Sequence, residues 1–116
     1  MEQKEYYDLS NQAEIVKELK IDLLPTNKKC HSLKIEHGYF EAVLNGKKTY
    51  EIRRNDRGFK LGELLRLREL DAECNGYTGR FALAEITHIT SDKRFCKEGY
   101  VVMGIKLLMG GRELEN

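Results

Sequence analysis

The sequence has almost no net charge, little proline and cysteine, and no long apolar run. Its 20 basic and 19 acidic residues give a formal net charge of +1, which excludes a protein that coats DNA through bulk charge. No apolar stretch approaches the ~20 residues that a membrane span needs, and the first ten residues contain acids but no apolar core, so we expect neither a membrane anchor nor a signal peptide. Three cysteines cannot all pair within one chain, and we therefore expect reduced thiols in the cytoplasm.

The motifs of several catalytic and metal sites are also missing. The chain contains neither GxxxxGK[ST] nor GxGxxG in a strand–helix setting, and no serine lies in an elbow-like context. These absences exclude P-loop nucleotide hydrolysis and a Ser-His-Asp triad. Its cysteines and histidines follow no CxxC or HxxxH spacing, so we expect no metal and no cofactor.

The 116 residues, of which 34% are charged and 41% hydrophobic, indicate one folded domain. Its N-terminal part, residues 1–29, is predicted to be an amphipathic helix and a linker. The helix is expected to begin after Ser10 and to end near Leu24, because Pro25 lacks the amide hydrogen that a helix needs. We expect its apolar stripe to pack on the main body, or else to contact a second copy or a protein partner. That stripe consists of Ile15, Val16, Leu19 and Leu23.

Alternating apolar and polar residues predict five strands in the rest of the chain. These are His31–Glu36, Thr49–Arg54, Leu64–Leu70, Arg80–Thr90 and Tyr100–Leu108. A short helix is expected over Tyr39–Asn45, stopped by Gly46. The irregular alternation around Glu85 and Ile86 indicates a β-bulge. We therefore predict an α+β fold over residues 30–109, a small, mostly antiparallel sheet closed into a barrel with flanking short helices, and a frayed tail over residues 110–116.

The near-neutral total conceals one basic segment. Residues 46–60, GKKTYEIRRNDRGFK, contain six basic and two acidic residues, a balance of +4, whereas the remaining 101 residues carry −3. Arginine and lysine in such a segment suit the oxygens of a phosphate. A localised anionic ligand is therefore expected at this segment.

The two-residue period of a strand places Thr49, Glu51 and Arg53 on one face, directly after Lys48. The carboxylate can accept from a base edge or hold the arginine, while the two cations meet phosphate. The alternative interpretation is an ordinary solvated face with a Glu–Arg pair of little energetic value.

Aromatic residues near this segment can stack on bases or belong to the core. Three border loops or the helix start and are predicted to face the site: Tyr39, Phe59 and Tyr100. Three others fall within apolar periodicity and are predicted to lie in the core: Phe40, Tyr50 and Phe81.

The stretches HSLKIEHGYFEAVLNGKKTYEIRRNDRGFKLGELLRLRELD, YTGRFALAEITHIT and KEGYVVMGIKL together resemble the ASCH domain of the PUA-like superfamily. The signature is a glycine, a lysine two residues on, and then a glutamate and an arginine, here Gly46, Lys48, Glu51 and Arg53. Small bacterial and phage proteins of unknown function share this resemblance. It implies a small PUA-like β-barrel with flanking helices and a role in RNA binding.

One ASCH branch consists of amidohydrolases that act on N4-acylated cytidine, and its motif lysine corresponds to Lys48. The catalytic threonine of that branch corresponds to Glu51 here, and its glutamate lies on an extra helix where this chain has only the loop 91–99, with Glu98 as a loose match. An enzyme built on Lys48 and Glu51 therefore remains an alternative.

We thus expect a nucleic-acid-binding module that binds RNA or a nucleotide-like ligand in a basic cleft. The expected ligand-binding residues are Lys34, Tyr39, Lys47, Lys48, Thr49, Glu51, Arg53, Arg54, Arg57 and Tyr100. The alternatives are a small amidohydrolase and a phage or bacterial protein-interaction module that uses the N-terminal helix.

Overall fold

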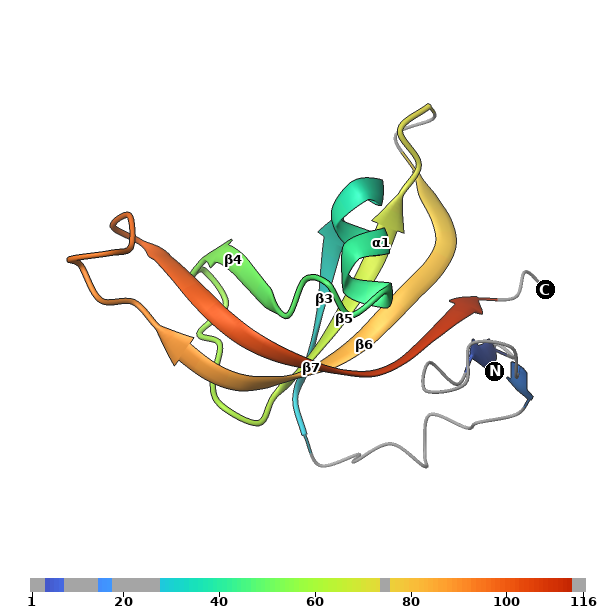
Figure 1. The fold of residues 1–116 in the computed structure, drawn as a ribbon, viewed down its shortest axis with the longest axis horizontal. Helices are drawn as coiled ribbons and strands as arrows, with labels where there is room; N and C mark the ends of the chain where they lie inside the picture. The colour runs from blue at the N-terminus through green and yellow to red at the C-terminus, as the bar shows by residue number, and fades with distance from the viewer. Residues whose placement is uncertain (1–3, 8–14, 18–27, 74–75, 114–116) are drawn as a thin grey trace.

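A computed structural model of the chain describes residues 4–7, 15–17, 28–73 and 76–113. Its centre is a strongly curved sheet that forms a half-barrel around one short helix (Figure 1). Five strands make the half-barrel: β3 (Cys30–Ile35), β4 (Tyr50–Arg54), β5 (Leu64–Leu70), β6 (Tyr77–Thr90) and β7 (Tyr100–Glu113). The helix α1 (His37–Leu44) lies in the concavity, with Phe40 and Val43 fully buried. The predicted α+β class is confirmed, whereas the predicted barrel is closed only in part.

Strand pairing runs in the order β3, β5, β6, β7 and β4, so that β3 and β4 form the two free edges of the half-barrel. All these pairs are antiparallel except β3 with β5, which is parallel. A parallel pair needs a crossover connection, and α1 with β4 supplies it between β3 and β5. The register of β6 with β7 shifts between Leu83 and Ala84 and again between Ile86 and His88, which confirms the predicted bulge.

The core lies between the helix and the concave face of the sheet. Alternate residues of the strands meet there, as the two-residue period predicts. Its main members are Leu33, Ile35, Phe40, Leu65, Leu67, Ile86, Met103 and Ile105. Phe40 and Phe81 are buried, as predicted for both. No helix within the described residues is long and apolar enough to cross a membrane.

Two predictions at the chain ends are wrong in part. Residues 15–17, assigned to a helix, instead form the strand β2 (Ile15–Lys17), which pairs with β1 (Lys4–Tyr7). Ile15 and Val16 are β-branched, and such residues fit a strand at least as well as a helix. The other residues of the predicted helix lie outside the described part of the chain.

At the C-terminal end, β7 continues through Glu113, so the first four residues of the predicted frayed tail are strand. Gly110 and Gly111 are buried, and their backbones pair with β1 on one side and β6 on the other. The pairing of this end of β7 with β1 was not predicted, because the segment that contains β1 was expected to precede a helix. Likewise β6 begins at Tyr77, three residues earlier than predicted.

Candidate functional site

A cleft of about 410 Å³ lies at the open side of the half-barrel. Residues of β3, α1 and β4 line it, which places the two free edge strands on either side of one hollow. The lining residues are Lys34, Ile35, Glu36, Tyr39, Lys48, Tyr50, Glu51, Ile52 and Arg53. Five of the ten predicted ligand-binding residues are among them: Lys34, Tyr39, Lys48, Glu51 and Arg53.

The carboxylate of Glu51 organises the cations of this cleft. Its side chain is only 4% exposed, because β4 turns it inward, and Lys48 Nζ donates to its Oε1. Arg53 Nε donates to Oε2 at 2.8 Å. A buried carboxylate is stable only when it is paired and hydrogen-bonded, and here it has both partners. Glu51 and Arg53 therefore share one strand face, as predicted, and Lys48 joins them from the preceding turn.

These bonds leave donors available on both cations. Lys48 Nζ also donates to the carbonyl oxygen of Tyr50 at 2.6 Å, so one of its three N–H groups has no acceptor within the described residues. Arg53 uses Nε towards Glu51 and Nη2 towards Lys34 O, out of five N–H groups. The trio carries a net charge of +1, and the exposed Lys34 and Glu36 of the lining cancel each other, so the cleft as a whole carries +1. The cleft can thus offer fixed hydrogen-bond donors and positive charge to an anion.

Arginine side chains span the gap between β3 and β4. Arg53 Nη2 donates to the carbonyl oxygen of Lys34, and Arg57 Nη1 donates to that of Ser32, each at 2.8 Å. Both carbonyls belong to the outer edge of β3, beside which the described part of the chain places no second strand on that side. Side-chain donors thereby replace part of the strand ladder that would close a complete barrel. Of these two arginines, Arg53 lines the cleft and the predicted residue Arg57 lies outside it.

Two tyrosines flank Lys48. Its Nζ lies 4.8 Å from the centroid of the Tyr50 ring and 5.6 Å from that of Tyr39, within cation–π range. The prediction that Tyr50 belongs to the core is wrong, because Tyr50 and Ile52 occupy the outer face of β4 and are 46% and 56% exposed. The inner face of this strand is taken by the charged pair Glu51–Arg53, and no described element covers the outer one.

Other predicted site residues lie elsewhere. Lys47 and Thr49 are exposed and do not line the cleft. Arg54, on the outer face of β4, lies opposite Tyr100 in the strand register, 5.5 Å from its ring centroid. A hydrogen bond from Arg54, together with its charge and that of Lys97, lowers the pKa of the Tyr100 hydroxyl below its usual value. Phe59, expected at the site, is buried and meets His31 edge-on in the core, at 4.7 Å between ring centroids.

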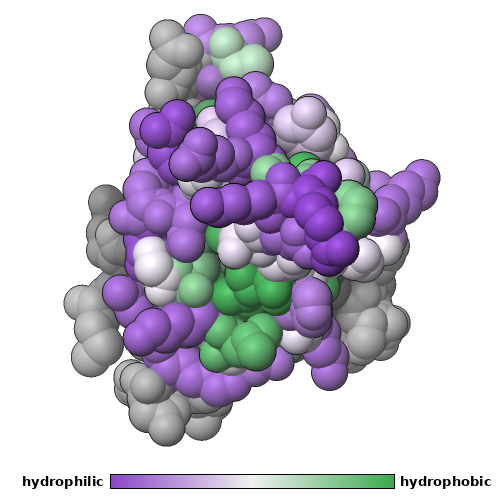
Figure 2. Space-filling view, turned by 90° about the vertical axis from the view of Figure 1, so that its left-hand side faces the viewer, coloured by the Kyte–Doolittle hydropathy of each residue, from purple (hydrophilic) through white to green (hydrophobic). Residues whose placement is uncertain are grey.

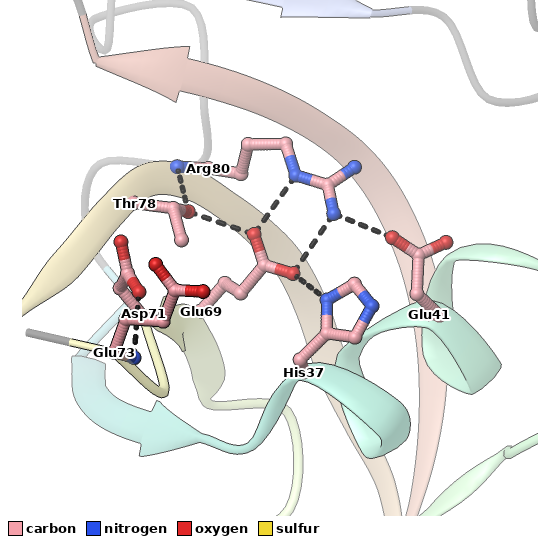
Figure 3. Close-up of polar contacts among 7 residues, drawn as sticks. All are labelled: His37, Glu41, Glu69, Asp71, Glu73, Thr78 and Arg80. Atoms are coloured by element: carbon pink, nitrogen blue, oxygen red, sulfur yellow. Dashed lines mark hydrogen bonds and ion pairs between the residues drawn. The ribbon is translucent and has the colours of Figure 1, made fainter. Parts of the chain in front are cut away.

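A second polar cluster, which the sequence analysis missed, surrounds Glu69 on the core face of β5 (Figure 3). The Glu69 carboxylate accepts from Arg80 Nε and Nη2 at 2.9 and 2.8 Å and from Thr78 Oγ1 at 2.7 Å, and it contacts His37 Nδ1 at 2.5 Å. Arg80 also contacts Glu41 of α1 at 2.5 Å. The alternation Leu65, Leu67, Glu69 is the sequence signal that could have found this acid on an apolar face.

Burial alone would raise the pKa of the Glu69 carboxyl, but the hydrogen bonds from Arg80, His37 and Thr78 lower it to about 2. The ligand atoms of His37, Glu41 and Glu69 lie within 4.8 Å of one another, a spacing compatible with a metal ion. The Arg80 guanidinium, however, already contacts both carboxylates. We therefore interpret the cluster as an ion network that fixes α1 to β5 and β6.

Comparison with known proteins places the chain in a family. Residues 30–105 match the family described as a domain of unknown function (DUF3850). The chain is also similar to an "Uncharacterized 12.9 kDa protein in GpA 3'region" of Escherichia phage P2, with 39% identity over 75 residues. That alignment covers 65% of this chain and 66% of the phage protein. All of the cleft and all of the Glu69 cluster lie within residues 30–105, and the chain belongs to the DUF3850 family.

Proposed function

We propose that the cleft binds a phosphate-bearing nucleotide unit of RNA. The observation that carries this proposal is the pair of cations, Lys48 and Arg53, which one buried carboxylate holds in fixed positions with N–H donors to spare. Fixed donors bind an anion without the loss of side-chain entropy that a mobile lysine incurs. The likeness of Gly46, Lys48, Glu51 and Arg53 to the ASCH signature supports the same ligand.

The tyrosines support a nucleotide rather than a free inorganic anion. Tyr39 and Tyr50 are half-exposed beside Lys48, where a base can stack on a ring while its phosphate meets the cations. Stacking tolerates any base, so we expect modest sequence preference at this position.

The amidohydrolase alternative has less support. Lys48 and Glu51 are in contact, but no serine or threonine is among the cleft-lining residues, and the hydroxyl of Thr49 belongs to an exposed residue outside the cleft. A lysine-activated hydroxyl would need to be within hydrogen-bond reach, about 2.6–3.2 Å.

The test compares two exposed lysines of equal charge. We expect Lys34→Ala, inside the cleft, to weaken binding of a fluorescein-labelled single-stranded RNA several-fold in an anisotropy titration, and Lys47→Ala, outside it, to change affinity by less than twofold. Arg53→Ala should weaken binding by about tenfold or more, because a hydrogen bond to a charged group contributes about 1.5–3 kcal/mol. Circular dichroism checks that each variant is folded.

Affinity should also fall with added salt, with a slope in log K against log[salt] of about −0.7 for each phosphate contact on a single strand. Absence of binding at low salt would overturn the proposal, as would equal losses for Lys34→Ala and Lys47→Ala.

A further inference from the structure

The outer face of β4 carries an exposed row of side chains that begins in the cleft, which Tyr50 and Ile52 line, and continues beyond it to Arg54. Tyr50, Ile52 and Arg54 follow one another at two-residue spacing and therefore share this face. Each is exposed, although Tyr50 and Ile52 are large and apolar. The row spans about 13 Å, at about 3.3 Å per strand residue.

At each end of this row, positively charged side chains lie beside an aromatic ring. Lys48 Nζ lies 4.8 Å from the Tyr50 ring centroid at one end. At the other end, Arg54 Cζ and Lys97 Nζ each lie 5.5 Å from the centroid of Tyr100, the residue paired with Arg54 across the ladder. We call these residues the β4 strip: Lys48, Tyr50, Ile52, Arg54, Lys97 and Tyr100.

The composition of the β4 strip indicates what it fits. It has three cations and no carboxylate, with two rings and one aliphatic side chain between them. A scattered exposed apolar residue needs no explanation, but here the apolar groups form a line flanked by positive charge. Figure 2 views the molecule from the end that carries β4 and the β6–β7 turn, where most of the surface is hydrophilic and one apolar patch lies in the lower half of the view.

We propose that the β4 strip is a track for single-stranded RNA that continues from the cleft to the β6–β7 turn. This inference rests on the proposed function and adds the form and length of its ligand. Bases stack on Tyr50 and Tyr100, Ile52 fills the space between them, and Arg54 and Lys97 meet phosphates. Duplex RNA hides its base faces within the stack, so it cannot use the rings in this way.

The length of the β4 strip requires several nucleotides. Stacked nucleotides advance by about 3.4 Å along one strand, so a row of about 13 Å corresponds to roughly four steps. A dinucleotide in the cleft therefore does not reach Tyr100, whereas an octanucleotide spans the whole track.

Variants at the far end of the track separate this inference from the proposed function. We expect Arg54→Ala and Tyr100→Leu to weaken octauridylate binding by about five- to 100-fold, since a stacked base contributes roughly 1–3 kcal/mol. Their affinity for diuridylate, measured by NMR chemical-shift titration, should match that of the wild type. Lys97→Ala, a substitution of an exposed loop side chain, should reduce the salt slope for the octamer by about 0.7. The control is Lys93→Ala, an exposed lysine of the same turn outside the β4 strip.

Each outcome decides between the two proposals. If the far-end variants bind octauridylate as the wild type does, the track is wrong and the cleft stands. If they lose diuridylate and octauridylate equally, the β4 strip is not a separate contact and the track is again wrong. A duplex that binds as tightly as the octamer would overturn the single-strand assignment. If the wild type binds neither oligonucleotide, the proposed function fails and the track with it.

Discussion

Glu51 and Glu69 show how a buried acid is used in two ways within one small domain. Each lies on an inward strand face, with side-chain exposures of 4% and 2%, and each is held by cations. Around Glu51 the cations Lys48 and Arg53 keep N–H groups that have no acceptor among the described residues, while around Glu69 the Arg80 guanidinium also contacts Glu41. The first arrangement is open to a cleft, and the second ties a helix to the sheet. This difference is why we assign the ligand to the Glu51 site.

The depressed pKa of Glu69 predicts an acid-dependent loss of stability. In the folded state this carboxyl has a pKa of about 2 instead of the ordinary 4.5, so the unfolded state binds more protons between these values. The stabilisation is complete above pH ~4.5 and decreases as the pH falls towards 2. We expect Glu69→Gln to lower the free energy of unfolding at neutral pH by about 3 kcal/mol, because it breaks a buried ion pair, and to flatten its decline in acid.

Urea denaturation at a series of pH values measures this effect. The matched control is Glu73→Gln, which changes an exposed acid in the turn that follows β5, three residues after the end of that strand. A Glu69→Gln variant with the same acid decline as the wild type would contradict the assignment.

The connection from α1 to β4 depends on a glycine at the end of the helix. The backbone N–H of Gly46 donates to Val43 O at 3.0 Å with φ +72°, a left-handed conformation that other residues adopt at a cost. This turn delivers Lys48 to the cleft two residues later. The same property of glycine predicts from the sequence that the helix ends at Gly46.

Two glycine substitutions test this role. We expect Gly46→Ala to lower the free energy of unfolding by about 1 kcal/mol, because alanine is strained at positive φ. Gly38→Ala, within α1, should raise it by several tenths of a kcal/mol, since an added Cβ meets nothing within 4 Å and the unfolded chain loses entropy. Chemical denaturation compares the two, and effects of the same sign would contradict this account.

Strand and helix positions were predictable where the element has one face towards the core and one towards solvent. Leu65 and Leu67 against Arg66 and Arg68 located β5 to the residue. β4 was located to within one residue, but the core assignment of Tyr50 was wrong, because the buried position belongs to Glu51 and the exposed ones to Tyr50 and Ile52, which inverts the usual pattern. Periodicity reports which residues share a face, but only tertiary packing decides which face is covered.

The candidate site was predictable to the same extent. The short motif placed Lys48, Glu51 and Arg53 together, since they are neighbours in sequence. Lys34 and Tyr39, chosen beside the basic segment, also reach the cleft. The Glu69 cluster joins residues from α1, β5 and β6, with directly contacting residues up to 39 positions apart, and no local pattern predicts which of them meet.

At the scale of the whole molecule, the core of the half-barrel lies between Leu33 and Leu107 among the described residues, and the family match covers residues 30–105. We therefore expect a chain that begins at residue 28 to fold and to unfold cooperatively. This chain keeps the contact of Lys28 with Glu85 and lacks β1 and β2.

Thermal denaturation followed by circular dichroism, with an NMR spectrum of the folded state, measures this outcome. The comparison is a chain that ends at residue 99 and lacks β7, which should not fold because β7 pairs with β1, β4 and β6. Non-cooperative unfolding of the chain from residue 28 would mean that the N-terminal segment is part of the folding unit.

The arginines that span the open side of the half-barrel join its two edges, one of them inside the cleft and one outside it. Arg53 donates to the edge of β3 through Nη2 and also lines the cleft, so under the proposed function a phosphate bound to its remaining N–H groups would meet a guanidinium that is tied to β3. Arg57 donates to Ser32 further along that edge and lies outside the cleft. Two arginine side chains therefore hold β3 to the β4 side of the half-barrel, and under the proposed function only the contact made by Arg53 lies beside the ligand.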